Sequence, residues 1–136
     1  MKKRIVYSIF YFALLLAHYA QAKAFKLTLK DVSYNIEQNA ISKKWVLKKT
    51  EKGKNVWFKQ NSKIPYEELY LDLAESVRNF PSNSLNLVKD CSQSDYVLVQ
   101  WIELQPRNLT LCETIPRDYY FIRGLRQKFE NLIAKR

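Results

Sequence analysis

Residues 95–104 read Asp-Tyr-Val-Leu-Val-Gln-Trp-Ile-Glu-Leu and carry the strongest strand signal in the chain. Apolar side chains alternate along the segment and occupy both of its faces: Val97, Val99 and Trp101 on one, and Tyr96, Leu98, Ile102 and Leu104 on the other. A period of two is typical of a strand, and apolar residues on both faces indicate a central strand covered on both sides, at least in part. The sequence therefore predicts a sheet built around residues 95–104.

The segment after this strand predicts a hairpin and a disulfide. Residues 105–108 read as a turn into a second strand at residues 109–112, which brings Cys112 back toward the start of the first strand. Cys91 lies just before that start, and it is the one other cysteine of the chain. A Cys91–Cys112 bond would join neighbouring ends, and the pair lacks the C-x-x-C spacing of a redox site. We expect a structural disulfide.

Two segments show helical periodicity. The first begins near Pro65, ends near Asn79 and carries an apolar stripe: Tyr66, Leu69, Tyr70, Leu73, Val77 and Phe80. The second begins near Pro116 and continues to the C-terminus, with the stripe Tyr119, Ile122, Leu125, Phe129, Leu132 and Ile133. Apolar residues at i, i+3, i+4 and i+7 predict one buried face on each helix. Gly124 weakens the second helix and would let it approach the sheet closely.

The remaining segments predict strands. Residues 24–39 alternate with a period of two over one or two strands, and residues 85–89 form a short strand. Residues 44–48 and 55–59 form a hairpin, with Gly53 where the turn needs a positive φ. The predicted order is βββ-α-βββ-α, an α+β fold with five to six mainly antiparallel strands and two helices on one face. Residues 23–136 are expected to form this single domain.

The N-terminal residues have the three parts of a secretory signal peptide. A basic start of Lys2, Lys3 and Arg4 precedes an apolar run, and Ala20-Gln21-Ala22 forms a cleavage site. The apolar run is shorter than the roughly 20 residues that span a bilayer. We expect cleavage after Ala22, no stable membrane insertion of the mature chain, and a periplasmic location. An oxidising compartment favours the disulfide.

Composition excludes several classes of enzyme. His18 is the one histidine, and it is lost with the signal. The mature chain therefore has no histidine general base, metal ligand or pH switch, which excludes the usual catalytic triads and zinc hydrolases. The two glycines, Gly53 and Gly124, are too far apart for a nucleotide-binding loop. We expect no cofactor, no metal site and no catalytic residues.

Positive charge is concentrated in the first half of the mature chain. Residues 23–64 contain 11 lysines and three carboxylates, a net charge of +8, whereas residues 65–136 have a net charge of −1. A binding interpretation assigns partner contacts to the hairpin at residues 43–63: Lys43, Lys44, Lys48, Lys49, Lys52, Lys54, Trp57 and Lys59. The alternative interpretation is edge protection, in which the lysines prevent sheet aggregation and the tryptophans belong to the core.

Carboxylates form two weaker candidate sites. Glu68, Asp72 and Glu75 share the polar side of the first helix, which is what a solvated helix face shows. A second group, Asp90, Asp95 and Glu113, surrounds the predicted disulfide, but its spacing matches no calcium loop. Ordinary surface charges are the simpler interpretation of both groups.

Three functions fit these observations. The first is an exported, non-catalytic protein that inhibits or neutralises an envelope enzyme or toxin, as lysozyme inhibitors and bacteriocin immunity proteins do. The second is an accessory or assembly factor of an envelope machine, and the third is a carboxylate-dependent glycan hydrolase. The expected partner is a protein of the cell envelope, with acidic character if the lysines bind it. A lipopolysaccharide phosphate or an anionic glycan is an alternative, and the signal peptide argues against nucleic acid.

Overall fold

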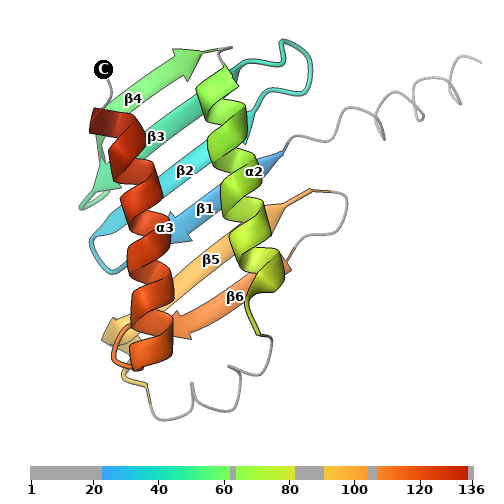
Figure 1. Ribbon diagram of the computed structural model, residues 1–136. Coiled ribbons are helices and arrows are strands. Elements are labelled where there is room, and N and C mark those ends of the chain that lie inside the picture. The colour runs from blue at the N-terminus through green and yellow to red at the C-terminus, as the bar shows by residue number, and fades with distance from the viewer. Residues whose placement is uncertain (1–22, 62–63, 82–90, 104–106, 135–136) are drawn as a thin grey trace, which may run out of the picture.

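The computed structural model describes residues 23–61, 64–81, 91–103 and 107–134 (Figure 1). Within these ranges the chain forms six strands, two helices and a 3₁₀ turn. Their bounds are β1 (Ala24–Thr28), β2 (Val32–Gln38), β3 (Trp45–Glu51), β4 (Lys54–Asn61), α2 (Ile64–Asn79), η3 (Gln93–Asp95), β5 (Tyr96–Ile102), β6 (Arg107–Cys112) and α3 (Pro116–Ala134). Neither described helix is long and apolar enough to cross a bilayer.

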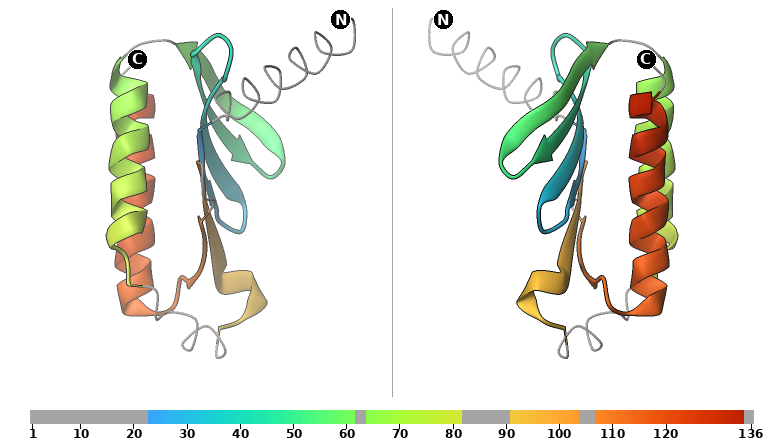
Figure 2. Two further views of the ribbon diagram at one scale, coloured as in Figure 1. Left: turned by 90° about the vertical axis from the view of Figure 1, so that its right-hand side faces the viewer. Right: turned by 90° about the vertical axis from the view of Figure 1, so that its left-hand side faces the viewer.

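The strands form one antiparallel sheet in the order β4-β3-β2-β1-β5-β6. Both helices lie on the same face of this sheet, so the molecule has two layers (Figures 1 and 2). The predicted α+β class is confirmed. The described strands are divided four before α2 and two after it, and four agrees with the prediction of one or two strands in residues 24–39 followed by a hairpin. The strand predicted at residues 85–89 lies outside the described residues.

Strand alternation places the core between the sheet and the helices. Phe25 and Leu27 of β1 are fully buried, as are Tyr34 and Ile36 of β2 and Leu47 of β3. The side chains between them along each strand face the other side of the sheet, because successive residues of a strand point to opposite faces. The sheet is therefore apolar on its helix side and mainly polar on the other side, where apolar side chains occur on β5.

The turn between β3 and β4 has two residues. Lys52 has a φ of 49° and Gly53 a φ of 78°, and Glu51 pairs with Lys54 on either side of them. Two-residue turns with positive φ at both central positions match the right-handed twist of paired strands. The predicted hairpin and the role of Gly53 are both confirmed.

The prediction of a central strand that is covered, at least in part, on both faces is confirmed for β5. Val97 and Val99 are buried beneath the helices, whereas Tyr96 and Leu98 on the other face are half-buried and Ile102 is 43% exposed. β5 is central in the sheet because it pairs with both β1 and β6. Its second apolar face reflects this position and not a second helix layer.

The helix stripes are confirmed except at one position. The α2 stripe is buried throughout, and Ile122, Leu125 and Phe129 are buried on α3. Tyr119, predicted to be on the stripe, is 41% exposed because Asp118 occupies the inward position of the first turn. The buried series therefore begins one residue earlier, at Asp118, and continues at i+4, i+7 and i+11.

The expectation that Gly124 allows close approach to the sheet is also wrong. Gly124 is exposed, and a Cβ built there would have no neighbouring atom within 4 Å. We therefore predict that Gly124→Ala raises the free energy of unfolding by about 0.5–1 kcal/mol, because alanine restricts the unfolded chain and costs nothing in the helix. Urea denaturation measures this change.

Gly53→Ala is the matched control. Gly53 has a φ of 78°, where a Cβ is strained, so the same substitution should lower stability by about 1 kcal/mol. Equal effects of the two substitutions would contradict the assigned backbone geometry.

Candidate functional site

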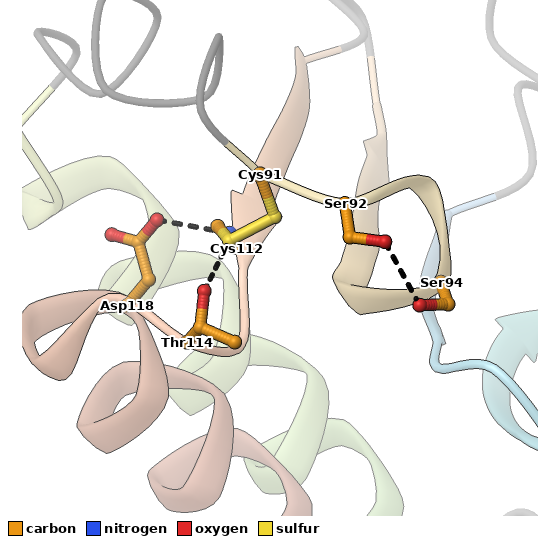
Figure 3. Close-up of a disulfide and its surroundings, with 6 residues drawn as sticks. All are labelled: Cys91, Ser92, Ser94, Cys112, Thr114 and Asp118. Atoms are coloured by element: carbon orange, nitrogen blue, oxygen red, sulfur yellow. Dashed lines mark hydrogen bonds between the residues drawn. A yellow bond between two sulfur atoms is a disulfide. The ribbon is translucent and has the colours of Figure 1, made fainter.

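The predicted disulfide is present and closes the corner between η3 and α3 (Figure 3). Cys91 and Cys112 are bonded with a Cα–Cα distance of 6.0 Å. The backbone N–H of Glu113 donates to the Asp95 carbonyl over 2.9 Å, and the Thr114 hydroxyl donates to the Cys112 sulfur over 3.0 Å. The start of β5 and the end of β6 are therefore joined by covalent and hydrogen bonds.

Asp118 is a buried carboxylate beside this disulfide that the sequence analysis did not identify. Its side chain is completely buried, and its Oδ2 accepts a hydrogen bond from the Cys112 backbone N–H over 3.0 Å (Figure 3). Its Oδ1 has no hydrogen-bond partner, and Arg117 Nε lies 3.6 Å from it. The carboxylate is in the first turn of α3, where the helix dipole favours negative charge. Asp118 thus holds the start of α3 against the end of β6.

The carboxylate groups noted in the sequence form no metal site in the described residues. No cluster of three or more acidic, cysteine or histidine side chains with metal-binding geometry occurs among them. Glu68, Asp72 and Glu75 are exposed on α2, and Asp72 forms an ion pair with Lys128 over 2.7 Å. Asp90 lies outside the described residues.

The structure divides the predicted lysine surface between the two ends of the β3–β4 hairpin. Lys43 and Lys44 lie in the loop between β2 and β3, whereas Lys52 and Lys54 lie at the turn between β3 and β4. The length of a seven-residue strand, roughly 20 Å, separates the two pairs. Lys59 is exposed on β4 opposite Leu47.

Two of the predicted contact residues make contacts inside the protein. Lys49 follows Trp45 and Leu47 on the helix side of β3, and its ammonium group forms an ion pair with Glu130 of α3 over 2.6 Å. Trp57, opposite Lys49 on β4, is half-buried and packs against the core. Neither side chain is presented on the open side of the sheet.

Lys49 belongs to a polar cluster with Tyr34, Arg126 and Glu130. The Tyr34 hydroxyl and Lys49 Nζ both donate to Oε1 of Glu130, and Arg126 Nε donates to the Tyr34 oxygen over 3.1 Å. Lys49 Nζ also lies 3.5 Å from the Glu51 carboxylate. The cluster connects α3 to β2 and β3 at the rim of the core.

The pKa values in this cluster follow from its hydrogen bonds. Burial alone would raise the pKa of the Glu130 carboxyl, but the hydrogen bonds from Lys49 and Tyr34 together hold it below its usual value. The bond to Glu130 raises the pKa of the Lys49 ammonium group against the opposing effect of burial. Burial and the bond to Glu130 raise the pKa of Tyr34. At neutral pH the cluster consists of the Lys49–Glu130 ion pair, the neutral Tyr34 phenol and the charged Arg126 guanidinium.

The open face of the sheet carries a polar row across five strands. Lys48, Asn35, Lys26, Gln100 and Asn108 are consecutive cross-strand neighbours from β3 to β6. The two lysines flank Asn35 and are separated by two strand spacings, about 10 Å. Neither lysine has an ion-pair partner among the residues that the structure describes. This row is a cationic, hydrogen-bonding surface.

The charge asymmetry of the sequence becomes an asymmetry between the sheet and α2. The four carboxylates of α2 are all exposed on the helix side of the molecule: Glu67, Glu68, Asp72 and Glu75. The lysines that are exposed or half-buried without an ion pair belong to the sheet and its loops. The carboxylates of α2 and the open-face lysines Lys26 and Lys48 therefore lie on opposite sides of the molecule.

The comparisons with known proteins find no relative from which a function could be transferred. No family model matches the chain, and no curated protein or solved structure matches it either. A functional argument for this protein therefore rests on its own residues.

We predict that Asp118→Ala lowers the free energy of unfolding by about 1–3 kcal/mol, because the Cys112 N–H is left buried without an acceptor. Asp118→Asn is the matched variant, since its amide oxygen can still accept that bond, and it should retain more stability. Chemical denaturation with the disulfide intact measures both. If alanine and asparagine cost the same, the hydrogen bond is not what Asp118 contributes.

We predict that Glu130→Gln lowers stability at neutral pH by about 0.5–1 kcal/mol, a small value because part of the carboxylate is exposed. The folded-state pKa of Glu130 lies below its ordinary value of 4.5, so the stabilisation is present above that pH. It is lost as the pH falls through the folded-state pKa. Wild type and variant should therefore converge in acid, as measured by denaturation across a pH series.

Glu75→Gln is the control for this pH dependence. Glu75 is an exposed carboxylate of α2 with no ion-pair partner in the described structure, so its substitution should leave stability unchanged at every pH. A difference between wild type and Glu130→Gln that persists in acid would contradict an electrostatic role for Glu130.

Proposed function

We propose that this chain is an exported binding protein that inhibits or neutralises an envelope-acting enzyme or toxin, and that it is not itself an enzyme. The observation that carries the proposal is the cationic open face of the sheet, where Lys26 and Lys48 lie on either side of Asn35 with no ion-pair partner among the described residues. An ion pair formed on binding contributes most to affinity when neither charge has to give up an earlier ion pair. This face therefore suits an acidic protein surface. The predicted signal peptide, together with the disulfide, supports a periplasmic location for the mature protein.

The loop between β2 and β3 supplies an apolar anchor beside these lysines. Ile41 is 92% exposed at the tip of this loop, which extends beyond the end of the sheet in Figure 1. The Asn39 side-chain oxygen accepts hydrogen bonds from the backbone N–H groups of Ile41 and Ser42, which fixes the shape of the loop. Lys43 and Lys44 follow directly. A preorganised loop with an apolar tip and charged flanks is suited to insertion into the cleft of an enzyme.

The alternatives fit the geometry less well. An assembly factor that captures apolar segments would present an apolar groove, whereas the open face is mainly amide, hydroxyl and ammonium groups. A glycan hydrolase needs two carboxylates converging on a cleft. In the described residues the α2 carboxylates lie on a convex helix surface, and they face solvent. The proposed contact surface is therefore the β2–β3 loop with the adjoining open face.

We predict that the triple substitution of Lys43, Lys44 and Lys48 to serine weakens partner binding at least about tenfold at about 0.1 M salt. The mature chain, immobilised, would capture its partner from an envelope extract, and mass spectrometry would identify the captured protein. Raising the salt to about 1 M shortens the Debye length from about 10 Å to about 3 Å and should release it. The captured enzyme should be inactive in the complex and regain activity on release.

A second triple variant, Lys52, Lys54 and Lys59 to serine, removes the same charge from the other end of the hairpin and from β4. Binding close to wild type by this variant would support a localised contact. Equal weakening by both variants, or a captured enzyme that remains active in the complex, would refute the proposal. If the lysine variants aggregate but bind normally, edge protection is the correct role of the lysines.

A further inference from the structure

A cleft on the helix side of the molecule is unrelated to the lysine surface. It has a volume of about 170 Å³ and lies between α3 and the residues that follow β1 and β6, with the lining Leu29, Glu113, Tyr119, Ile122, Arg123 and Arg126. An engineered cavity of about 150 Å³ holds a benzene molecule, so this cleft, which is open to solvent, fits a ligand with roughly six to nine non-hydrogen atoms. Leu29 follows the last residue of β1, in the turn to β2, and lines the cleft together with residues of α3.

The cleft has two guanidinium groups on one wall. Arg123 and Arg126 are three residues apart on α3, and side chains at this spacing are neighbours on a helix surface. Arg126 Nε donates to the Tyr34 hydroxyl over 3.1 Å, and its two terminal amino groups form no hydrogen bond or ion pair with the residues that the structure describes. Arg123 has no ion pair among the described residues. A planar guanidinium with free terminal donors is the side chain best suited to bind a carboxylate or phosphate through two hydrogen bonds.

Glu113 adds the opposite charge to the same cleft. Its carboxylate forms no ion pair with either arginine in the described structure, although all three line the cleft. A doubly charged phosphate would be repelled by this carboxylate. A ligand that carries both a carboxylate and an ammonium group would satisfy all three charged side chains. Leu29 and Ile122 are buried residues that line the rest of the cleft, and they suit a short aliphatic group.

We propose that this cleft binds the zwitterionic head group of a small aliphatic α-amino acid. The carboxylate of the ligand binds Arg123 and Arg126, its ammonium group binds Glu113, and its side chain contacts Leu29 and Ile122. The inference rests on this cleft alone and does not depend on the inhibitory function proposed for the lysine surface. The shared chemistry fits a free amino acid and also an amino-acid head group at the end of a larger molecule.

Titration of the mature chain by NMR or calorimetry tests this proposal with a matched set of probes. Alanine and leucine should bind with a dissociation constant on the order of 1 mM or tighter. Propionate lacks the ammonium group, propylamine lacks the carboxylate, and both should bind at least about tenfold more weakly. Alanyl-alanine separates the two charges and distinguishes a free amino acid from a peptide. Inorganic phosphate should not compete.

Two substitutions divide the roles within the cleft. Arg123→Gln should weaken leucine binding about tenfold or more, whereas Arg117→Gln, the same change on α3 outside the cleft, should leave it unchanged. Glu113→Gln should weaken leucine but strengthen propionate, because it removes a repulsive charge. A general loss of stability would weaken the binding of both ligands, so opposite changes for leucine and propionate would show a specific role for Glu113. Thermal denaturation would show that each variant is folded.

Several outcomes would overturn the proposal. These are no binding of alanine or leucine at about 10 mM, tighter binding of phosphate than of amino acids, or equal effects of Arg123→Gln and Arg117→Gln. If Arg123→Gln does not fold, the comparison of leucine with propionate in Glu113→Gln decides. None of these results bears on capture of a protein partner by the β2–β3 loop, so the two proposals can fail separately.

Discussion

The packing of Phe129 against the first two strands fixes the position of α3, and the rest of the structure depends on it. Phe129 is fully buried, with its ring centroid 5.1 Å from that of Tyr34 and 6.2 Å from that of Phe25. Aromatic pairs at such distances add to the free energy gained by burial. Because side chains of a helix have fixed angular spacing, seating Phe129 also fixes its neighbours on the helix surface. Arg126 and Glu130 are thereby both placed at the Tyr34 hydroxyl.

This placement explains why one lysine of the hairpin differs from the others. Lys49 is on the same side of β3 as Trp45 and Leu47, where an unpaired ammonium group would be costly to bury. Glu130 supplies the compensating charge, Tyr34 also donates to Glu130, and Arg126 donates to Tyr34. The lysines of the opposite side, such as Lys48, need no such partner because water solvates them. The same strand therefore contributes one structural lysine and one lysine available for binding.

The secondary-structure elements could be predicted from the sequence, whereas most contacts between them could not. Strand alternation, helix stripes and the position of Gly53 predicted the described elements, and the two cysteines predicted the disulfide, because each signal is local or follows from hairpin geometry. The burial of Asp118 and the exposure of Tyr119 depend on which way the first turn of α3 faces, and neighbouring elements decide that. Trp45, Leu47 and Lys49 are spaced two residues apart on one strand, and this spacing did indicate that Lys49 faces the helices. No such local pattern indicated that its partner is Glu130, 81 residues further along the chain.

The two-layer arrangement gives the molecule two chemically distinct surfaces that do not overlap. Lys26 and Lys48 face away from the helices, whereas Arg123 and Arg126 are on α3, on the other side of the sheet. A protein bound to the open face would leave the cleft accessible to a small ligand. One connection between the two surfaces runs through β2 and β3, since Tyr34 binds Arg126 and Lys49 binds Glu130 in the same cluster. Lys48 directly precedes Lys49 in β3, so a partner that binds Lys48 and displaces β3 would disturb this cluster.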